Sequence, residues 1–301
     1  MKKKILITYK NHFIGKFIFD MLKDEYLVVD EEPDYRNFDE TKLFIDKCFP
    51  EVIILNIPFC GGIKMNIGQP ADLILNNIIP QTNVIRSAFE CNVPQLLFIG
   101  SSCMYPKIFS RPMKEDDILT GPFEETNLAY SISKISGWQL CAAIRKQYKY
   151  QYQTLIPANL FGEYDDFNPQ NAHVVGSLMM KFHDAKISGA EKVDVWGTGE
   201  PVRDFLYAAD LANAVKQFIG NNYDFDYLNI GSGSGYSIRD IAKTMKKVVG
   251  FEGKIVFDPS KPDGMKVKVL DNSKAISFEW EPLFALETGL QKTYEWFVNN
   301  I

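Results

Sequence analysis

Two segments of the sequence carry residue types that together suit acid–base chemistry at a carbonyl group. Tyr130 and Lys134 are four residues apart, so on a helix they share one face. A neighbouring ammonium favours the phenolate, which brings proton transfer by the phenol closer to working pH. Ser101 follows an apolar run that ends at Gly100, where its hydroxyl can bind the same carbonyl oxygen. The three side chains predict a catalytic triad.

Short apolar runs alternate with amphipathic stretches, and these predict the elements that must position the triad. The continuous apolar runs, typical of buried parallel strands, are 4–8, 26–30, 52–56, 95–100, 152–157 and 227–231. Helical spacing occurs near 14–24, 39–48, 71–91 and 128–148, with a kink expected at Pro80. The alternation predicts an α/β fold of the Rossmann type, a doubly wound parallel sheet with helices on both faces.

From about residue 161 the sequence becomes richer in turns and predicts a smaller C-terminal α/β portion. Its predicted elements are a strand at 193–197 and helices near 173–187, 209–220, 237–249 and 283–299. We expect a dinucleotide-binding domain of residues 1–160 plus about 203–232, and a substrate domain of about 161–202 and 233–301.

The turn after the first run lacks most of the glycines that a dinucleotide site uses. Tyr9 and His12 occupy the first two positions of a G-x-x-G-x-x-G pattern, and only Gly15 remains. Their bulk either blocks the usual approach of a pyrophosphate or forces another loop path, and an ordinary strand-to-helix turn is the alternative. The acidic segment 30–32 ends the second run and favours NAD over NADP, unless it is only a solvated turn.

Composition narrows the class of protein. The 301 residues include 33 Lys+Arg and 38 Asp+Glu, a net charge of −5, so no affinity for nucleic acid or acidic membranes is expected. No apolar run approaches the roughly 20 residues of a membrane span. The five cysteines are scattered without a C-x-x-C pair, which argues against disulfides and metal and for a cytoplasmic protein. Lys10 and His183 belong to no predicted site and are interpreted as solvated surface.

Two strings, GSSCMYPK at 100–107 and EETNLAYSISK at 124–134, resemble GDP-L-fucose synthases of the extended short-chain dehydrogenase/reductase superfamily. Further similar segments are 157–162, 168–174, 195–199, 203–205 and 257–264. The resemblance covers about residues 50 to 299, and the N-terminal part departs from it. It implies epimerisation at C3 and C5, and NAD(P)H-dependent reduction at C4, of a GDP-4-keto-6-deoxy sugar.

The resemblance also implies roles for individual residues. Tyr130 would protonate the C4 oxygen with Ser101 and Lys134 beside it, while Cys103 and His173 would form the acid–base pair of epimerisation. The implied GDP-sugar ligands are Lys181, Trp196, Arg203 and Asp263. The implied cofactor-lining residues are Gly100, Lys134, Pro157, Asn159 and Leu160, with Gly15 added from the loop. The resemblance implies NADP(H) as the cofactor, whereas the acidic segment 30–32 favours NAD(H), so both cofactors stay open.

Other interpretations of these residues and of the whole chain stay open at this point. Cys103 could be a small buried hydrophobe, His173 a residue that starts a helix, and Arg203 a surface partner of Asp204 or Glu200. The chain could instead be a reductase or an epimerase alone, acting on a related GDP-4-keto sugar such as a heptose. A non-catalytic nucleotide-sensing protein is the third alternative, because the glycine loop is degraded.

The helix at 128–148 carries more apolar residues than one sheet face needs. They are Ile135, Trp138, Leu140, Ala142 and Ile144. In the resembling family this helix forms a two-fold interface, so a homodimer is expected.

Overall fold

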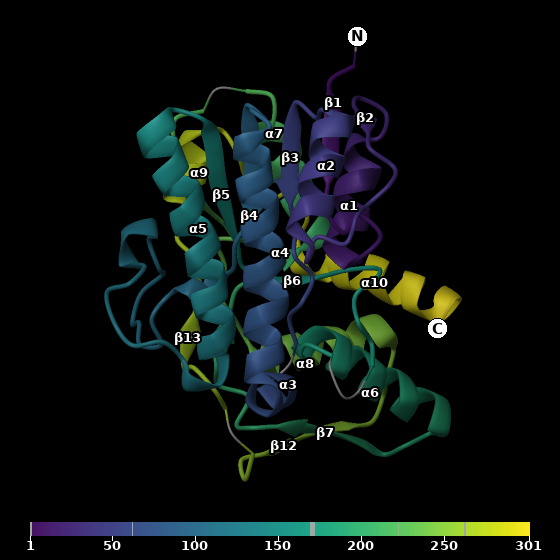
Figure 1. The fold of residues 1–301 in the computed structure, drawn as a ribbon. Coiled ribbons are helices and arrows are strands. Elements are labelled where there is room, and N and C mark those ends of the chain that lie inside the picture. Colours follow the sequence, from purple (N-terminus) through teal and green to yellow (C-terminus); the bar gives the residue numbers. More distant parts are fainter. Residues whose placement is uncertain (1, 62, 169–171, 222, 262) are drawn as a thin grey trace.

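A six-stranded parallel sheet forms the centre of the computed structural model, which describes residues 2–61, 63–168, 172–221, 223–261 and 263–301 (Figure 1). Its strands are β1 (Lys4–Ile7), β2 (Leu27–Val28), β3 (Val52–Leu55), β4 (Gln95–Ile99), β5 (Gln151–Pro157) and β10 (Tyr227–Ile230). They lie in the order β10-β5-β4-β3-β1-β2, and every pairing is parallel. The predicted doubly wound sheet is confirmed, although the second strand is shorter than the expected 26–30.

Helices cover both faces of this sheet. In Figure 1, α4 (Pro70–Glu90) and α5 (Leu128–Tyr148) lie side by side in front of it, with α2 (Phe38–Cys48) packed against α4. On the other face α1 (Phe13–Leu22) packs against α7 (Ala208–Phe218). The helix α4 continues through Pro80. None of the helices in the described ranges is both long and apolar enough to cross a membrane.

A second group of elements lies below the sheet in Figure 1. It contains α6 (Val174–Ser188), α8 (Ile238–Val249), α10 (Leu286–Asn300) and the parallel strands β7 (Lys192–Trp196) and β12 (Lys254–Asp258). The sequence patterns did not predict β12, nor the short strands β8 (Val202–Arg203), β11 (Tyr236–Ser237) and β13 (Val267–Lys268), which form one small sheet. The short helices α3 (Ile63–Gly68) and α9 (Ser273–Ser277), which lie outside this group, were also not predicted.

The buried apolar side chains form two clusters rather than one. The first surrounds the sheet and includes Ile5, Leu97 and Ile156, whereas the second includes Phe182 and Met245. Two short paired strands, β6 (Asn159–Phe161) and β9 (Phe205–Tyr207), carry the chain between the clusters. The position of one cluster against the other therefore depends on what fixes these two strands.

His183 lies in the second group and corrects a sequence-based interpretation. It was expected to be solvated, but its Nδ1 is 3.1 Å from the Tyr294 hydroxyl. Its ring also packs edge-on against Phe297, with the ring centroids 5.1 Å apart. The residue is half-buried because α10 covers this side of α6, a contact that no local pattern announces.

Asp204 fixes the crossing strands. It is 1% exposed, and its Oδ1 accepts hydrogen bonds from the Ser232 amide at 2.9 Å and hydroxyl at 2.6 Å. Its backbone amide donates to Lys268 at 2.9 Å, and its carbonyl accepts from the Asn159 amide at 3.1 Å. Burial raises the pKa of Asp204 to about 6 despite these donors. One residue thus joins β9 to β6, to β13 and to the loop after β10.

Replacing Asp204 should cost far more stability than replacing an exposed aspartate. Asp204→Ala leaves the partly buried Ser232 donors and the buried Leu270 amide without the carboxylate, so we expect the unfolding free energy to fall by about 3 kcal/mol. The control Asp194→Ala removes a carboxylate whose side chain is 57% exposed and should change it by less than about 0.5 kcal/mol. Urea denaturation measures both, and equal effects would contradict the bridging role.

Candidate active site

The carboxyl end of β4 carries the first group of predicted site residues. Ser101 precedes a short 3-10 turn (Ser102–Met104), and its hydroxyl oxygen accepts a hydrogen bond from the Cys103 amide at 3.1 Å. A Cβ at Gly100 would lie 3.1 Å from both Met104 and Thr154, so the backbone packs closely there. The turn brings the Ser101 hydroxyl and the Cys103 thiol to the same edge of the sheet.

The first turns of α5 bring Tyr130 and Lys134 to this edge. The Ser131 hydroxyl donates to the Cys103 carbonyl at 2.7 Å and so ties the helix to the turn. Lys134 is 2% exposed, and its Nζ donates to the Ile99 carbonyl at 3.1 Å. The same Nζ lies 5.6 Å from the centroid of the Tyr130 ring. The Tyr130 ring and the Lys134 ammonium therefore lie close together, as their spacing of four residues predicts.

Burial sets the protonation of this pair. It raises the pKa of Tyr130 well above its usual value, while a hydrogen bond with Ser101 acts in the opposite direction. Burial also lowers the pKa of Lys134 to about 8. Without substrate, the tyrosine is therefore a neutral phenol, equipped to donate a proton to an oxygen atom held beside Ser101.

Cys103 and His173 belong to the same neighbourhood. The Lys268 ammonium donates a hydrogen bond to Cys103 Sγ at 3.2 Å. Burial alone would raise the pKa of the Cys103 thiol, but the Lys268 charge, hydrogen bonds from Ser101 and Lys268, and His173 outweigh it, so the pKa is lowered. His173 precedes α6, yet its side chain makes no capping bond to that helix.

Two further groups near His173 were not predicted from the sequence. Cys60 Sγ lies 3.8 Å from His173 Nε2, in a residue that is exposed as a whole. Burial raises the pKa of Asp165 to about 6, with His173 opposing that rise. Cys60 follows the β3 run much as Ser101 follows β4, so its position after a buried strand could have indicated it. Asp165 lies in a turn-rich loop and gives no such signal.

Lys181 and Trp196 line a separate cavity of about 330 Å³ between α6 and β7. Lys181 Nζ lies 5.7 Å from the centroid of the Trp196 ring and donates to the Asp194 carbonyl at 3.1 Å. Lys261 Nζ is 5.6 Å from the same ring, which is 64% exposed. An exposed indole between two cations offers a flat apolar surface beside positive charge.

Arg203 and Asp263 lie near each other, on β8 and on the loop before β13. Both Asp263 carboxylate oxygens accept hydrogen bonds from Thr198, from its amide at 2.7 Å and its hydroxyl at 2.8 Å. Burial lowers the pKa of Arg203, with Asp263 and Cys103 opposing that shift. The surface pair of Arg203 with Asp204 is not formed, because Asp204 is buried and turns its carboxylate toward Ser232.

The remaining cofactor candidates follow β5. Pro157 ends that strand, and Asn159 and Leu160 begin β6. The Asn159 side-chain amide donates to the Asp204 carbonyl at 2.9 Å, which fixes its orientation. Pro169, Gln170, Asn171 and Pro262, which belong to the similar segments noted above, lie outside the described residues.

The loop between β1 and α1 keeps a glycine-like path without its glycines. Tyr9 takes the left-handed backbone conformation, with φ of 51°, at the first glycine position of the pattern. Its ring packs against Tyr35 and Phe59, with ring centroids 5.2 and 5.8 Å away. A Cβ at Gly15 would lie only 2.3 Å from the Tyr9 carbonyl oxygen. The turn into the α1 N-terminus therefore stays tight although two of the three glycines of the pattern are absent.

Lys10 in the same loop was expected at the surface, and that interpretation is wrong. It is 6% exposed, and its ammonium pairs with the Asp30 carboxylate and donates to the Val29 carbonyl at 3.5 Å. The hydrogen bond and the charge of Lys10 lower the pKa of Asp30. The acidic end of β2 is thus partly neutralised, which weakens its predicted repulsion of a 2′-phosphate.

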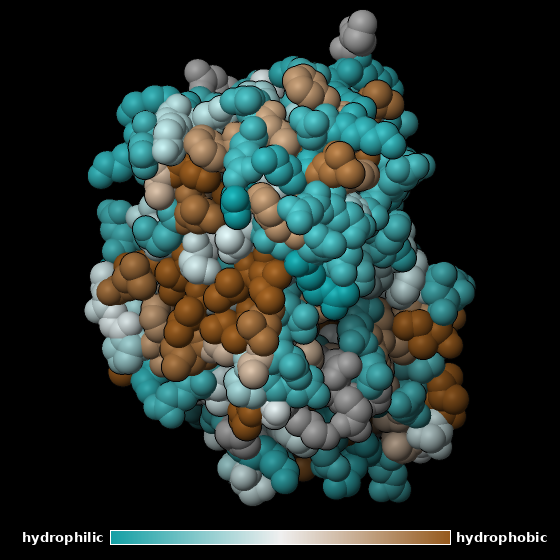
Figure 2. All heavy atoms as spheres, in the orientation of Figure 1, coloured by the Kyte–Doolittle hydropathy of each residue, from teal (hydrophilic) through white to brown (hydrophobic). Residues whose placement is uncertain are grey.

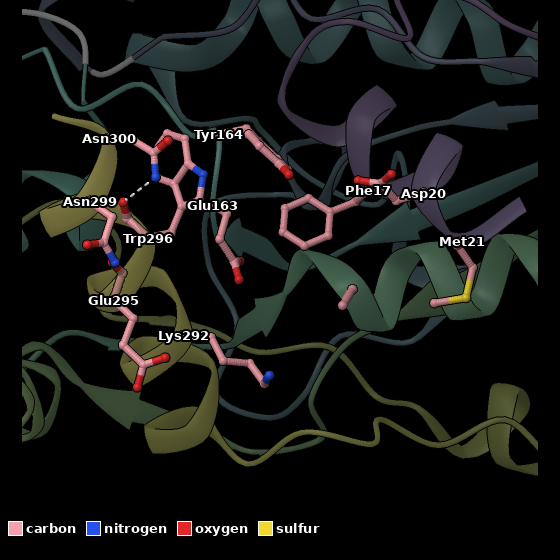
Figure 3. A pocket seen from close by; sticks show the side chains of 11 residues that line it. Phe17, Asp20, Met21, Glu163, Tyr164, Lys292, Glu295, Trp296, Asn299 and Asn300 are labelled. Carbon is pink, nitrogen blue, oxygen red and sulfur yellow. Dashed lines mark hydrogen bonds between the residues drawn. The ribbon is translucent and has the colours of Figure 1, made fainter. Parts of the chain in front are cut away.

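A cavity larger than the one beside Trp196 lies elsewhere. Figure 3 shows it between α1 and α10, with Phe17, Tyr164 and Trp296 among its lining residues and a volume of about 630 Å³. None of the predicted site residues is among the described residues that line it. Its size therefore carries no argument about the chemistry.

Gly15→Ala should weaken dinucleotide binding. The added Cβ would collide with the Tyr9 carbonyl and displace the turn before α1, so we expect at least about tenfold lower affinity for NADPH. Gly68→Ala is the matched control, because nothing lies within 4 Å of the Cβ it adds. Titration calorimetry measures both, with thermal melting to confirm folding, and unchanged affinity in folded Gly15→Ala would show that the turn is not used.

Comparisons with known proteins agree with this arrangement. The model of the NAD dependent epimerase/dehydratase family matches residues 12–231. The chain is 41% identical over 303 residues to "Putative GDP-L-fucose synthase 2" of Arabidopsis thaliana, covering 99% of this chain and 92% of the relative.

Two solved structures are also similar. A GDP-6-OMe-4-keto-L-xylo-heptose reductase from C. jejuni has a TM-score of 0.91 at 28% identity, with 100% of this chain and 99% of that chain covered. A GDP-L-fucose synthetase from Naegleria fowleri bound to NADP has a TM-score of 0.88 at 25% identity, with 100% and 95% covered. The chain therefore belongs to the NAD dependent epimerase/dehydratase family, and within that family it is similar to the GDP-L-fucose synthases.

Proposed function

We propose that this protein converts a GDP-4-keto-6-deoxy sugar by epimerisation at C3 and C5 followed by NADPH-dependent reduction at C4. The observation that carries the proposal is the meeting of two acid–base sets at the carboxyl end of β4. Tyr130, Ser101 and Lys134 form one set, and Cys103, one turn away and tied to α5 through Ser131, begins the other. One sugar ring held there reaches both.

Epimerisation uses the acidity of the protons that flank the C4 ketone. The Cys103 thiolate removes the proton from C3 or C5, and the electron pair of that C–H bond moves into the enolate. The His173 imidazolium then returns a proton to the opposite face of the same carbon. Cys103 releases its proton to solvent and His173 takes one up, which resets the pair for the second centre.

Reduction uses the triad. The bound dinucleotide supplies the hydride for C4, and Tyr130 donates its proton to the C4 oxygen, which the Ser101 hydroxyl orients. Lys134 is anchored on β4 and binds the nicotinamide ribose. Asn159 and Leu160 line this edge. NADPH is favoured over NADH because Lys10 pairs with Asp30, and because the similar GDP-L-fucose synthetase from Naegleria fowleri is bound to NADP.

The nucleotide of the substrate occupies the second group of elements. Its base lies in the cavity lined by Lys181 and Trp196. Arg203, which lies near Asp263 and Cys103, binds the diphosphate through its planar guanidinium. Asp263 shapes the adjoining turn through Thr198. We propose that the two apolar clusters broadly mark two domains with the substrate held between them, although Leu270, Ala275 and Trp280 of the C-terminal part pack in the first cluster.

A C4 reductase acting on a GDP-heptose is the second candidate. It is favoured by the similarity to a heptose reductase at a TM-score of 0.91. Against it stands the lowered pKa of Cys103, which a reductase has no need to maintain. A nucleotide-sensing protein is disfavoured by the complete triad, which sensing does not require.

Two variants separate the two half-reactions. Cys103→Ser should reduce solvent deuterium exchange at C3 and C5 of GDP-4-keto-6-deoxymannose by about 10²-fold or more, because the alcohol stays protonated. Tyr130→Phe should retain exchange but lose NADPH oxidation by a similar factor. The control is Cys91→Ser, which replaces a half-buried cysteine whose thiol contacts the Lys42 carbonyl of α2. Mass spectrometry and nicotinamide absorbance give the two readouts.

The outcomes distinguish the candidate functions. NADPH oxidation without exchange in the native protein would favour the reductase. Binding of GDP with neither activity would favour the sensing protein.

We also propose a homodimer formed through α4 and α5, in the cytoplasm, where the Cys103 thiol stays reduced. The residues on which the sequence argument for a dimer rested prove to be unsuited to it, because Trp138 and Ile144 are buried and Ile135 and Leu140 pack against the core. Other apolar side chains are exposed on the two helices. They are Leu75, Ile79, Leu128 and Ile132. Figure 2 shows this apolar patch over the lower halves of α4 and α5.

Charges placed on this patch should separate the subunits. Leu75→Glu with Ile132→Glu puts like charges across a two-fold interface, so we expect sedimentation to give the monomer mass at micromolar concentration. Ile187→Glu alters a still more exposed apolar residue on α6 and should leave the dimer intact. A native protein that sediments as a monomer would refute the proposal.

A further inference from the structure

A lysine from the small sheet of the second group reaches the turn that carries Cys103. Lys268 ends β13, is 8% exposed, and donates a hydrogen bond from Nζ to Cys103 Sγ at 3.2 Å. β13 pairs in parallel with β8, and the register sets Lys268 opposite Arg203. Two cations from different strands thus lie side by side, one bonded to the thiol.

We propose that Lys268 is a positioning residue that keeps Cys103 ionised and aimed, through an ammonium–thiolate pair, for removal of the C3 and C5 protons. The proposal rests on the epimerase function above. In this step the Cys103 sulfur takes the proton from C3 or C5, and the negative charge passes to the enolate oxygen at C4. Lys268 does not change, because its ammonium keeps its three protons. Lys268 then stabilises the thiolate that forms again when the thiol loses its proton to solvent.

Burial makes such a pair necessary. A single thiolate or ammonium that is shielded from water loses its free energy of hydration. In a thiolate–ammonium pair, the attraction between the two charges offsets part of that loss. The other groups that act on Cys103 are Arg203 from β8, Lys134 and Tyr130 from α5, His173 before α6, Cys60 after β3, and Ser101 on its own turn. Among the groups that lower the pKa of Cys103, Lys268 acts most strongly.

Alkylation of Cys103 by iodoacetamide, followed by peptide mass spectrometry across pH, tests the pair without any substrate. In the native protein the midpoint should lie below about 8.5, the usual value for a free thiol. Lys268→Met should raise it by at least about one unit, which slows alkylation near neutral pH about tenfold. Lys268→Arg should restore most of the rate, and Lys266→Met, an exposed lysine two residues earlier, should change nothing.

Deuterium exchange into the keto sugar then links the pair to catalysis. Lys268→Met should lower the exchange rate at saturating substrate about tenfold near neutral pH, and the rate should recover at alkaline pH. An unchanged alkylation midpoint in folded Lys268→Met, or an effect confined to KM, would overturn the proposal and make Lys268 a substrate ligand only.

Two further outcomes keep the tests separable. If Lys268→Met does not fold, the proposal is tested by the pH dependence of Cys103 alkylation in the native protein and in Lys268→Arg. A native alkylation midpoint at or above the usual pKa of a thiol overturns the proposal. If the native protein shows no exchange while its thiol midpoint is low and depends on Lys268, the proposed function fails and the ion pair stands as a structural fact. That result would refute the catalytic use of the pair.

Discussion

The site depends on one buried ammonium. Lys134 comes from the second turn of α5 and donates to the carbonyl of Ile99, the last residue of β4, in a place almost closed to water. Burial works against its charge and lowers its pKa to about 8, so the contact persists only because helix and strand pack tightly around it. The Ser131 bond to the Cys103 carbonyl adds a second tie. The phenol of Tyr130, the hydroxyl of Ser101 and the thiol of Cys103 are all positioned by this junction.

A second junction, at Asp204, brings the cations Arg203 and Lys268 close to Cys103. Asp204 holds β9 against the loop after β10 with its side chain and pairs with the Lys268 carbonyl through its amide. The residue before it, Arg203, and its partner in register, Lys268, therefore have fixed positions relative to the sheet. Because β6 and β9 carry the chain between the two apolar clusters, one buried carboxylate has an effect on both the fold and the charge around Cys103.

The N-terminal loop shows how a motif can change while its backbone path persists. Left-handed backbone at Tyr9 costs more than at glycine, and aromatic packing against Tyr35 and Phe59 offsets that cost. Gly15 could not change in the same way, since any side chain there meets the Tyr9 carbonyl. The loop thus keeps a tight turn although Tyr9 and His12 replace two glycines of the pattern.

Local sequence determined the regular elements and the spacing of the chemical groups. Continuous apolar runs gave the buried strands, and a spacing of four residues put Tyr130 and Lys134 on one helix face, because these periodicities belong to the backbone itself. Contacts between distant segments left no local mark. The Lys268–Cys103 bond joins residues 165 positions apart, and the Lys10–Asp30 pair and the burial of His183 also arise only when separate elements pack. Trp138 is a further example. The apolar residues of its helix indicate that the helix has a buried face, but only tertiary packing decides whether the core of the same chain or a second subunit covers that face.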